Sequence, residues 1–147
     1  MQNTLQKSDI EIFCKIHNLD DIKKEIYLNV FFGEKNMDNL KKCWELCETI
    51  NASFNDETGD KLTANSIPQH YTKNKELNKL NGLYDSFYYE PVYFIEHFSL
   101  GFSGGNILKY LFRCEDKGKK FDVDKVMFYC DFYLMKTYDN YKNYISK

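Results

Sequence analysis

Residues 122–134, DVDKVMFYCDFYL, repeat their apolar side chains at steps of three and four. These side chains would line one face of a helix with a period of 3.6 residues, and Asp122 stands where it would cap the start of that helix. The predicted face consists of Val123, Val126, Met127, Cys130 and Leu134, and Tyr138 and Tyr141 continue it. The stretch therefore predicts a long amphipathic helix that must pack against other helices.

Two shorter helices are expected immediately before it. Glu90-Pro91 is typical of a helix start, because proline at the first helical position loses no hydrogen bond. That helix would end near residues 100–101. Ser103 and the glycines after it would open the next helix, which would run to about Glu115, before the basic turn EDKGKK at 115–120.

Residues 8–50 predict three further amphipathic helices, which would start at Ser8, Asn18 and Asn36. Gly33 would end the second of them. Residues 51–66 are polar and have the composition of a loop. We therefore expect a mostly α protein, with a helical extension at 1–50, a linker at 51–66 and a small helical domain at 67–147.

The bulk composition limits the classes of partner. At 43% hydrophobic and 17% aromatic residues, the 147-residue chain can bury a core and does not look disordered. Its net charge of −2 gives no general reason for nucleic-acid binding, which usually needs a basic domain. Direct nucleic-acid binding is therefore not expected, and any anion site must be local. The many aromatic residues favour self-association into a homo-oligomer.

The sequence also suggests a compartment. Its first residues show no signal peptide, and no apolar run would span a bilayer. Its five cysteines lack the spacing of a zinc site, so we expect free thiols in a reducing cytosol. These patterns predict a cytoplasmic protein without a membrane partner, zinc or haem.

One segment carries a candidate anion site. Arg113 is the only arginine, and it follows Asn106 and Lys109 at spacings that place all three on one helix face. An arginine fork matches phosphate oxygens, and a helix opened by glycines such as Gly105 would leave N–H groups uncovered for the same anion. Lys119 and Lys120 in the next turn would close the pocket. The alternative is an ordinary solvated helix face after a plain turn.

A second constellation lies at Pro68, His70 and Tyr71. A histidine after a loop proline suits a general base or a phosphate ligand, because its pKa is near neutrality. The alternative is a surface histidine beside an aromatic ring. The chain contains no GxxxxGK[ST] phosphate loop, so any nucleoside triphosphate would bind without that motif.

Three stretches taken together resemble a known family. PQHY (68–71), EPVYFIEHFSLGFSGGNILKYLFR (90–113) and GKKFDVDKVMFYCDFYL (118–134) are similar to a small phage protein family of unknown function that includes the nucleotide kinase of phage T7. The resemblance covers about residues 67–136. Cys114 and Glu115 depart from the family pattern, where a small residue and glycine are usual, and the first 50 residues have no counterpart.

The resemblance implies a nucleoside monophosphate kinase-like phosphotransferase that binds a nucleotide, usually with Mg²⁺. In that reading His70 orients or deprotonates the acceptor, and Glu90 or Asp122 holds the metal ion. Phosphate charge would be neutralised by Lys109, Arg113 and Lys120. The wider set of implied binding residues is Tyr71, Gly105, Asn106, Lys109, Arg113, Lys119, Lys120 and Lys125.

A non-enzymatic function is the alternative. A phage protein of this kind would act in the host cytoplasm against host defence. It would sequester a nucleotide signal in the same pocket, or use its N-terminal helices to bind a host defence protein such as a CRISPR effector. A helical module without any ligand is the third reading.

Overall fold

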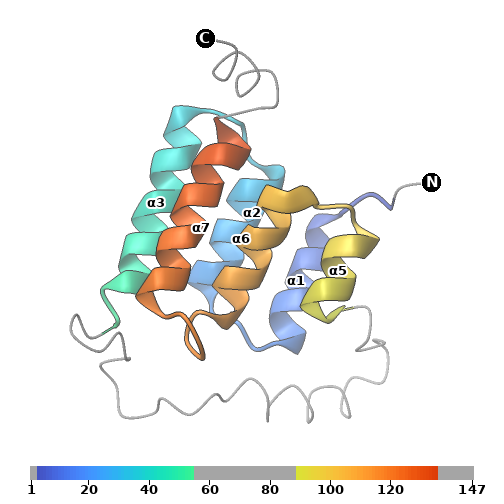
Figure 1. Cartoon of the computed structure of the whole chain (residues 1–147). Coiled ribbons are helices and arrows are strands. Elements are labelled where there is room, and N and C mark those ends of the chain that lie inside the picture. Colours follow the sequence, from blue (N-terminus) through green and yellow to red (C-terminus); the bar gives the residue numbers. More distant parts are fainter. Residues whose placement is uncertain (1–2, 55–88, 136–147) are drawn as a thin grey trace.

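The computed structural model describes residues 3–54 and 89–135, and within these ranges the chain is helical (Figure 1). This confirms the mostly α class predicted from the sequence. The helices are α1 (Lys7–Ile16), α2 (Asp21–Phe32), α3 (Met37–Asn51), α5 (Pro91–His97), α6 (Gly101–Arg113) and α7 (Lys120–Leu134).

The first three helices begin close to the predicted positions, with two corrections. The N-cap of α1 is Gln6, which forms a capping box with Asp9, and not Ser8. Asn18 does not cap α2, because it takes a left-handed φ of 53° and so separates α1 from the next helix. The α2 cap is Asp20, whose side chain accepts a hydrogen bond from the N–H of Lys23.

Asn36 caps α3 as predicted, and Pro91 is the first residue of α5 as predicted. The predicted starts of the last two helices are wrong. α6 begins at Gly101, so Ser103, Gly104 and Gly105 lie inside the helix and do not open it. α7 begins at Lys120 with Lys119 at its N-cap, so Asp122 lies in its first turn.

The helices form one bundle with a common core. α6 and α7 run antiparallel beside each other, α3 packs on the other side of α7, and α2 lies behind them (Figure 1). α1 and α5 lie at the opposite end from α3. Side chains of the N-terminal helices, such as Phe13 and Ile26, share a single buried cluster with Leu108 and Val126. The helices at 1–50 and those after residue 89 are therefore parts of one core.

One buried and one partly buried hydrogen bond tie α6 and α7 to the N-terminal helices. The Tyr27 hydroxyl on α2 donates to the carbonyl oxygen of Leu108 on α6 at 2.8 Å. The Trp44 indole N–H on α3 donates to the carbonyl oxygen of Met127 on α7 at 3.0 Å. Because both donors belong to the N-terminal helices, those helices hold the two segments that carry the candidate site. None of the described helices has the length and apolarity that crossing a bilayer requires.

Candidate functional site

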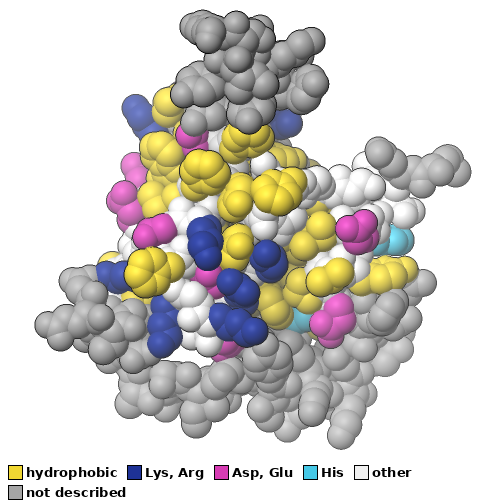
Figure 2. All heavy atoms as spheres, viewed as in Figure 1, with side chains coloured by type: hydrophobic (Ala, Val, Ile, Leu, Met, Phe, Trp, Pro, Cys, Tyr) yellow, Lys and Arg dark blue, Asp and Glu magenta, His cyan; other side chains and the backbone are white. Residues whose placement is uncertain are grey.

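The polar face predicted on α6 exists, and α7 completes it. Three cations surround the ring of Tyr110: Lys109 Nζ lies 4.3 Å from the ring centroid, Arg113 Cζ 4.9 Å and Lys125 Nζ 4.8 Å. We call Lys109, Arg113 and Lys125 around Tyr110 the cation cluster. Figure 2 shows the dark blue side chains gathered over the lower halves of α6 and α7.

A single buried carboxylate organises the cluster. Asp122 is fully buried, and its oxygens accept hydrogen bonds from Arg113 Nε at 3.0 Å and Nη2 at 3.3 Å. Lys125 Nζ lies 3.8 Å from the same carboxylate. Among the described residues no other carboxylate pairs with the cluster, so three cations share one negative charge. Two positive charges are therefore left for an external anion.

Gly118 makes this arrangement possible. Its N–H donates to Asp122 Oδ2 at 3.0 Å. A Cβ at this position would lie 1.9 Å from Asp122 Oδ1, so any other residue would push the carboxylate away. The turn between α6 and α7 is thus shaped around Asp122, and Lys119 and Lys120 follow directly at the start of α7.

An open pocket of about 570 Å³ adjoins the cluster and lies between α5 and α6. Its volume is in the range of small-molecule sites. The side chains that give it chemical character are Glu96, Phe102, Asn106 and Lys109. Lys109 belongs to both the pocket and the cation cluster, so a ligand in the pocket can place a charged group against the cluster.

The helices form the pocket wall by close packing at Gly105. A Cβ on Gly105 would lie 2.8 Å from Ile95 Cγ2, so glycine is needed where α6 meets α5. Gly105 is buried, and its role here is to let the two helices approach. This replaces the predicted role of Gly105 at an open helix start.

Several other predicted residues are not brought to the cluster. Pro68, His70 and Tyr71 lie outside the described residues. Glu90 is the N-cap residue of α5. Asp122 does not fit its predicted role as a magnesium ligand, because its carboxylate accepts hydrogen bonds from Arg113 and Gly118. The same role for Glu90 stays a prediction. Within residues 3–54 and 89–135, no three histidine, cysteine or acidic side chains converge as metal ligands.

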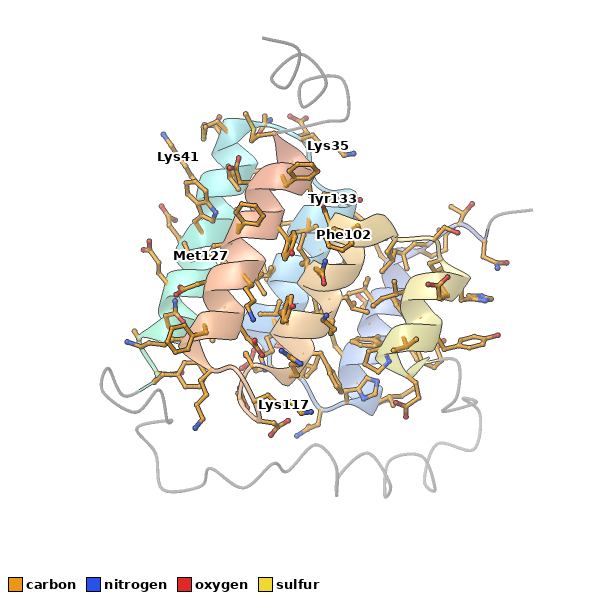
Figure 3. All side chains as sticks on the ribbon, in the orientation of Figure 1. Lys35, Lys41, Phe102, Lys117, Met127 and Tyr133 are labelled. Atoms are coloured by element: carbon orange, nitrogen blue, oxygen red, sulfur yellow. The ribbon has the colours of Figure 1, made fainter. Side chains whose placement is uncertain are left out.

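The aromatic part of the site was not predicted from the sequence. Tyr110 stacks nearly parallel with Tyr129 at a centroid distance of 6.3 Å, and Phe102 meets Tyr129 edge-on at 5.7 Å. Figure 3 shows Phe102 on the outer surface of α6, on the side of α7. The signal was present in the spacing, since Tyr110 precedes Arg113 by three residues and follows Lys109 directly.

The fold and the site describe a small all-α protein with a cationic, aromatic face on two antiparallel helices. The chain is similar over residues 66–131 to a family described as a protein of unknown function, DUF3310. The matched residues include the whole cation cluster. The family description names no activity, so the match gives no link between this chain and the nucleotide kinase of phage T7. No curated protein matches the chain, and no solved structure does.

Proposed function

We propose that the protein binds a nucleotide through the pocket and the cation cluster, as a nucleoside monophosphate kinase-like protein would. The observation that carries the proposal is the charge imbalance at Tyr110. Among the residues that the structure describes, Asp122 is the one carboxylate paired with Arg113 and Lys125, and Lys109 has no carboxylate partner. A phosphate group would supply the missing negative charge. Arg113 is held by two hydrogen bonds to Asp122, so one face of its guanidinium is oriented before a ligand arrives.

The pocket supports a nucleoside beside the phosphate. Phe102 offers an aromatic face on which a base can stack. Asn106 can both donate and accept hydrogen bonds, and Glu96 accepts them, as a base edge or sugar hydroxyl requires. The order of these groups, from Phe102 through Asn106 to Lys109, would place the base at the start of α6 and the phosphate toward its end.

A kinase-like reaction is chemically consistent with this arrangement. Phosphoryl transfer depends mainly on positioning the two substrates and on neutralising charge on the transferred group. The cation cluster can do both for one phosphate group. Magnesium, if it takes part, would be held chiefly by the phosphates themselves, because Asp122 is committed to Arg113.

Calorimetric titration with nucleoside mono- and triphosphates tests the binding. We expect saturable binding to the wild type and at least about tenfold weaker binding to Arg113→Lys, because lysine cannot reproduce a two-bond contact. Lys35→Gln is the matched control, since Lys35 lies over the ring of Tyr133 at 4.8 Å, away from the cluster. Equal affinities in the wild type and in Arg113→Lys would contradict the proposal.

The same samples separate an enzyme from a protein that only retains its ligand. Incubation with a monophosphate and a triphosphate, followed by denaturation and chromatography, shows whether phosphate has moved between them. Transfer of the γ-phosphate would establish a kinase. Recovery of both nucleotides unchanged, from a protein that binds them, would establish the alternative in which the protein sequesters a nucleotide signal.

A further inference from the structure

The outer face of α7 carries large aromatic side chains that the nucleotide pocket does not use. Phe121 is 77% exposed and Phe128 is 59% exposed, and Phe102 on α6 is 77% exposed. Phe121 and Phe128 are seven residues apart, so they lie on the same stripe of the helix. Lys125 lies between them on this stripe.

Phe128 and Phe102 are joined to the cation cluster by ring contacts. Phe128 meets Tyr129 at a centroid distance of 5.2 Å, and Tyr129 in turn contacts both Phe102 and Tyr110. The cations of the cluster surround Tyr110, so they stand within the aromatic surface and not around its edge. Figure 2 shows this mixture of hydrophobic and basic side chains on the visible face of α6 and α7.

We propose that this face binds single-stranded nucleic acid, with bases stacked on Phe128, Phe121 and Phe102 and phosphates held by the cation cluster. Exposed aromatic rings bind bases of any sequence, and lysines between them follow the backbone. The proposal shares the cation cluster and Phe102 with the nucleotide site, but it depends on Phe121 and Phe128 of α7, which lie outside the pocket lining. The net charge of −2 does not oppose it, because Lys109, Arg113 and Lys125 bring positive charge together locally on this face.

The position of the charges argues against other occupants. The cores of protein interfaces are depleted in charged residues, and lysine in particular is rare there. A second copy docked on the same face would bring the two cation clusters together, and like charges across an interface are costly. Duplex DNA hides its base faces, so it could use the cations but not the exposed rings.

Fluorescence anisotropy with a labelled oligothymidylate tests the proposal on the full chain. We expect saturable binding. The logarithm of the association constant should fall with the logarithm of the salt concentration with a slope of about 1.4, as expected when about two phosphates are neutralised on a single strand. A duplex of equal length should bind at least about tenfold more weakly. Polyglutamate serves as the probe for a purely ionic or acidic-protein surface, and it too should bind more weakly.

Substitutions locate the binding face. Phe128→Ser and Phe121→Ser should each weaken the oligothymidylate complex about fivefold or more, as expected for the loss of one stacked base. Val92→Ser is the matched control, because Val92 is an equally exposed apolar side chain (74%) on α5. Circular dichroism should show the same melting temperature for all of these variants, since the replaced side chains are largely in solvent.

Several results would overturn the proposal. They are absence of oligothymidylate binding, equal affinity for the duplex or for polyglutamate, and equal affinity of Phe128→Ser and Val92→Ser. A concentration-dependent mass in light scattering that falls in Phe128→Ser, without strand binding, would instead assign the face to a second copy. Free nucleotide affinity should be unchanged in Phe128→Ser, so this proposal and the nucleotide site can fail separately.

Discussion

Two buried ion pairs of this protein differ in the number of cations that surround each carboxylate. Lys23 on α2 is 3% exposed, and its Nζ lies 3.2 Å from Glu115 Oε1 after the end of α6. In this contact one ammonium group meets one carboxylate. At the cation cluster, a short distance along the chain, Asp122 is also buried but serves both Arg113 and Lys125, with Lys109 close by.

The two pairs differ in the charge balance and exposure of their cations. Burial alone would lower the pKa of Lys23, but the Coulombic attraction of Cys114 and Glu115 outweighs it, so the pKa is raised and the lysine stays charged. We call this contact the balanced pair, because one ammonium group meets one carboxylate in it. The cation cluster is not balanced, and its cations are partly exposed, with Arg113 at 32% and Lys125 at 49%. An unbalanced, accessible set of charges is what a site for anions requires.

The largest expected loss of stability comes from Asp122→Ala. This change leaves Arg113 and the Gly118 N–H without their shared acceptor, and removing one partner of a buried pair typically costs 3–5 kcal/mol. Because Arg113 is partly solvated, we expect about 3 kcal/mol, at the low end of that range. Urea denaturation measures it. Asp124→Ala is the control on the same helix, since Asp124 is exposed and its loss should cost less than about 1 kcal/mol.

The two residues of the balanced pair should differ in the stability lost when each is replaced. Glu115→Gln leaves the buried ammonium of Lys23 without its carboxylate, and we expect a loss of about 2 kcal/mol. Lys23→Met removes the charge and keeps the apolar stem, while Glu115, 35% exposed, can turn to water. That variant should stay within about 1 kcal/mol of the wild type. Equal losses in the two variants would show that the pair acts through its hydrogen bond and not through burial of the lysine.

Neither variant of the balanced pair should change anion binding, because Lys23 and Glu115 are not part of the cation cluster. Calorimetric titration with inorganic phosphate measures this. A loss of phosphate affinity in a folded Glu115→Gln protein would mean that the two pairs are coupled through the turn that joins α6 and α7.

The helices could be predicted because their apolar periodicity is local information. The stripe of α7, with Val123, Val126 and Cys130, is buried as predicted. Helix starts were harder, because they depend on competing caps. Ser8 and Asn18 are good capping residues, but Gln6 and Asp20 occupy those positions, and the left-handed Asn18 ends the first helix region instead. Packing of the N-terminal helices into the common core was not visible in the sequence at all, since it depends on contacts far apart in the chain.

The part of the candidate site that lies on α6 could be predicted from the sequence, but its contacts with α7 could not. The spacing of Asn106, Lys109 and Arg113 gives one face directly, and the structure keeps it. The partnership of Arg113 with Asp122 depends on the geometry of the turn at Gly118, which no helical period encodes. For that reason Asp122 was predicted to be a metal ligand, while the structure shows it orienting a cation.

The free energy of unfolding should fall at alkaline pH, because two buried thiols and Lys23 have raised pKa values. Burial raises the pKa of Cys14 and of Cys47 from 9.0 to about 12. Between pH 9 and about pH 12 the unfolded chain releases thiol protons that the folded protein keeps. The free energy of unfolding therefore falls as the pH rises through this range. Each thiol contributes at most about 1.4 kcal/mol per pH unit. The contribution of Lys23, whose pKa is raised above 10.5, is present below that value and is also lost as the pH rises through the folded pKa.

Urea denaturation in reducing buffer, from neutral pH to the alkaline limit of the fold, measures the slope. Cys14→Ala lowers stability at neutral pH because it leaves a cavity. It should nevertheless show a shallower alkaline decline than the wild type, since one titrating thiol is gone. A slope that is unchanged in both Cys14→Ala and Cys47→Ala would mean that these thiols do not control the alkaline loss.

The smallest expected effect on stability comes from Lys109→Gln, at the unpaired member of the cation cluster. Lys109 has no carboxylate partner among the described residues, and its contact with the Tyr110 ring at 4.3 Å is at a half-exposed site. The free energy of unfolding should therefore change by less than about 1 kcal/mol. Phosphate affinity of the same variant should fall about three- to tenfold, because Lys109 is the cation of the cluster that internal charges compensate least. The salt dependence of phosphate binding should become shallower at the same time. If Lys109→Gln instead destabilised the fold and left phosphate binding intact, the charge imbalance would be a feature of folding, and the contrast with the Lys23–Glu115 pair would lose its functional meaning.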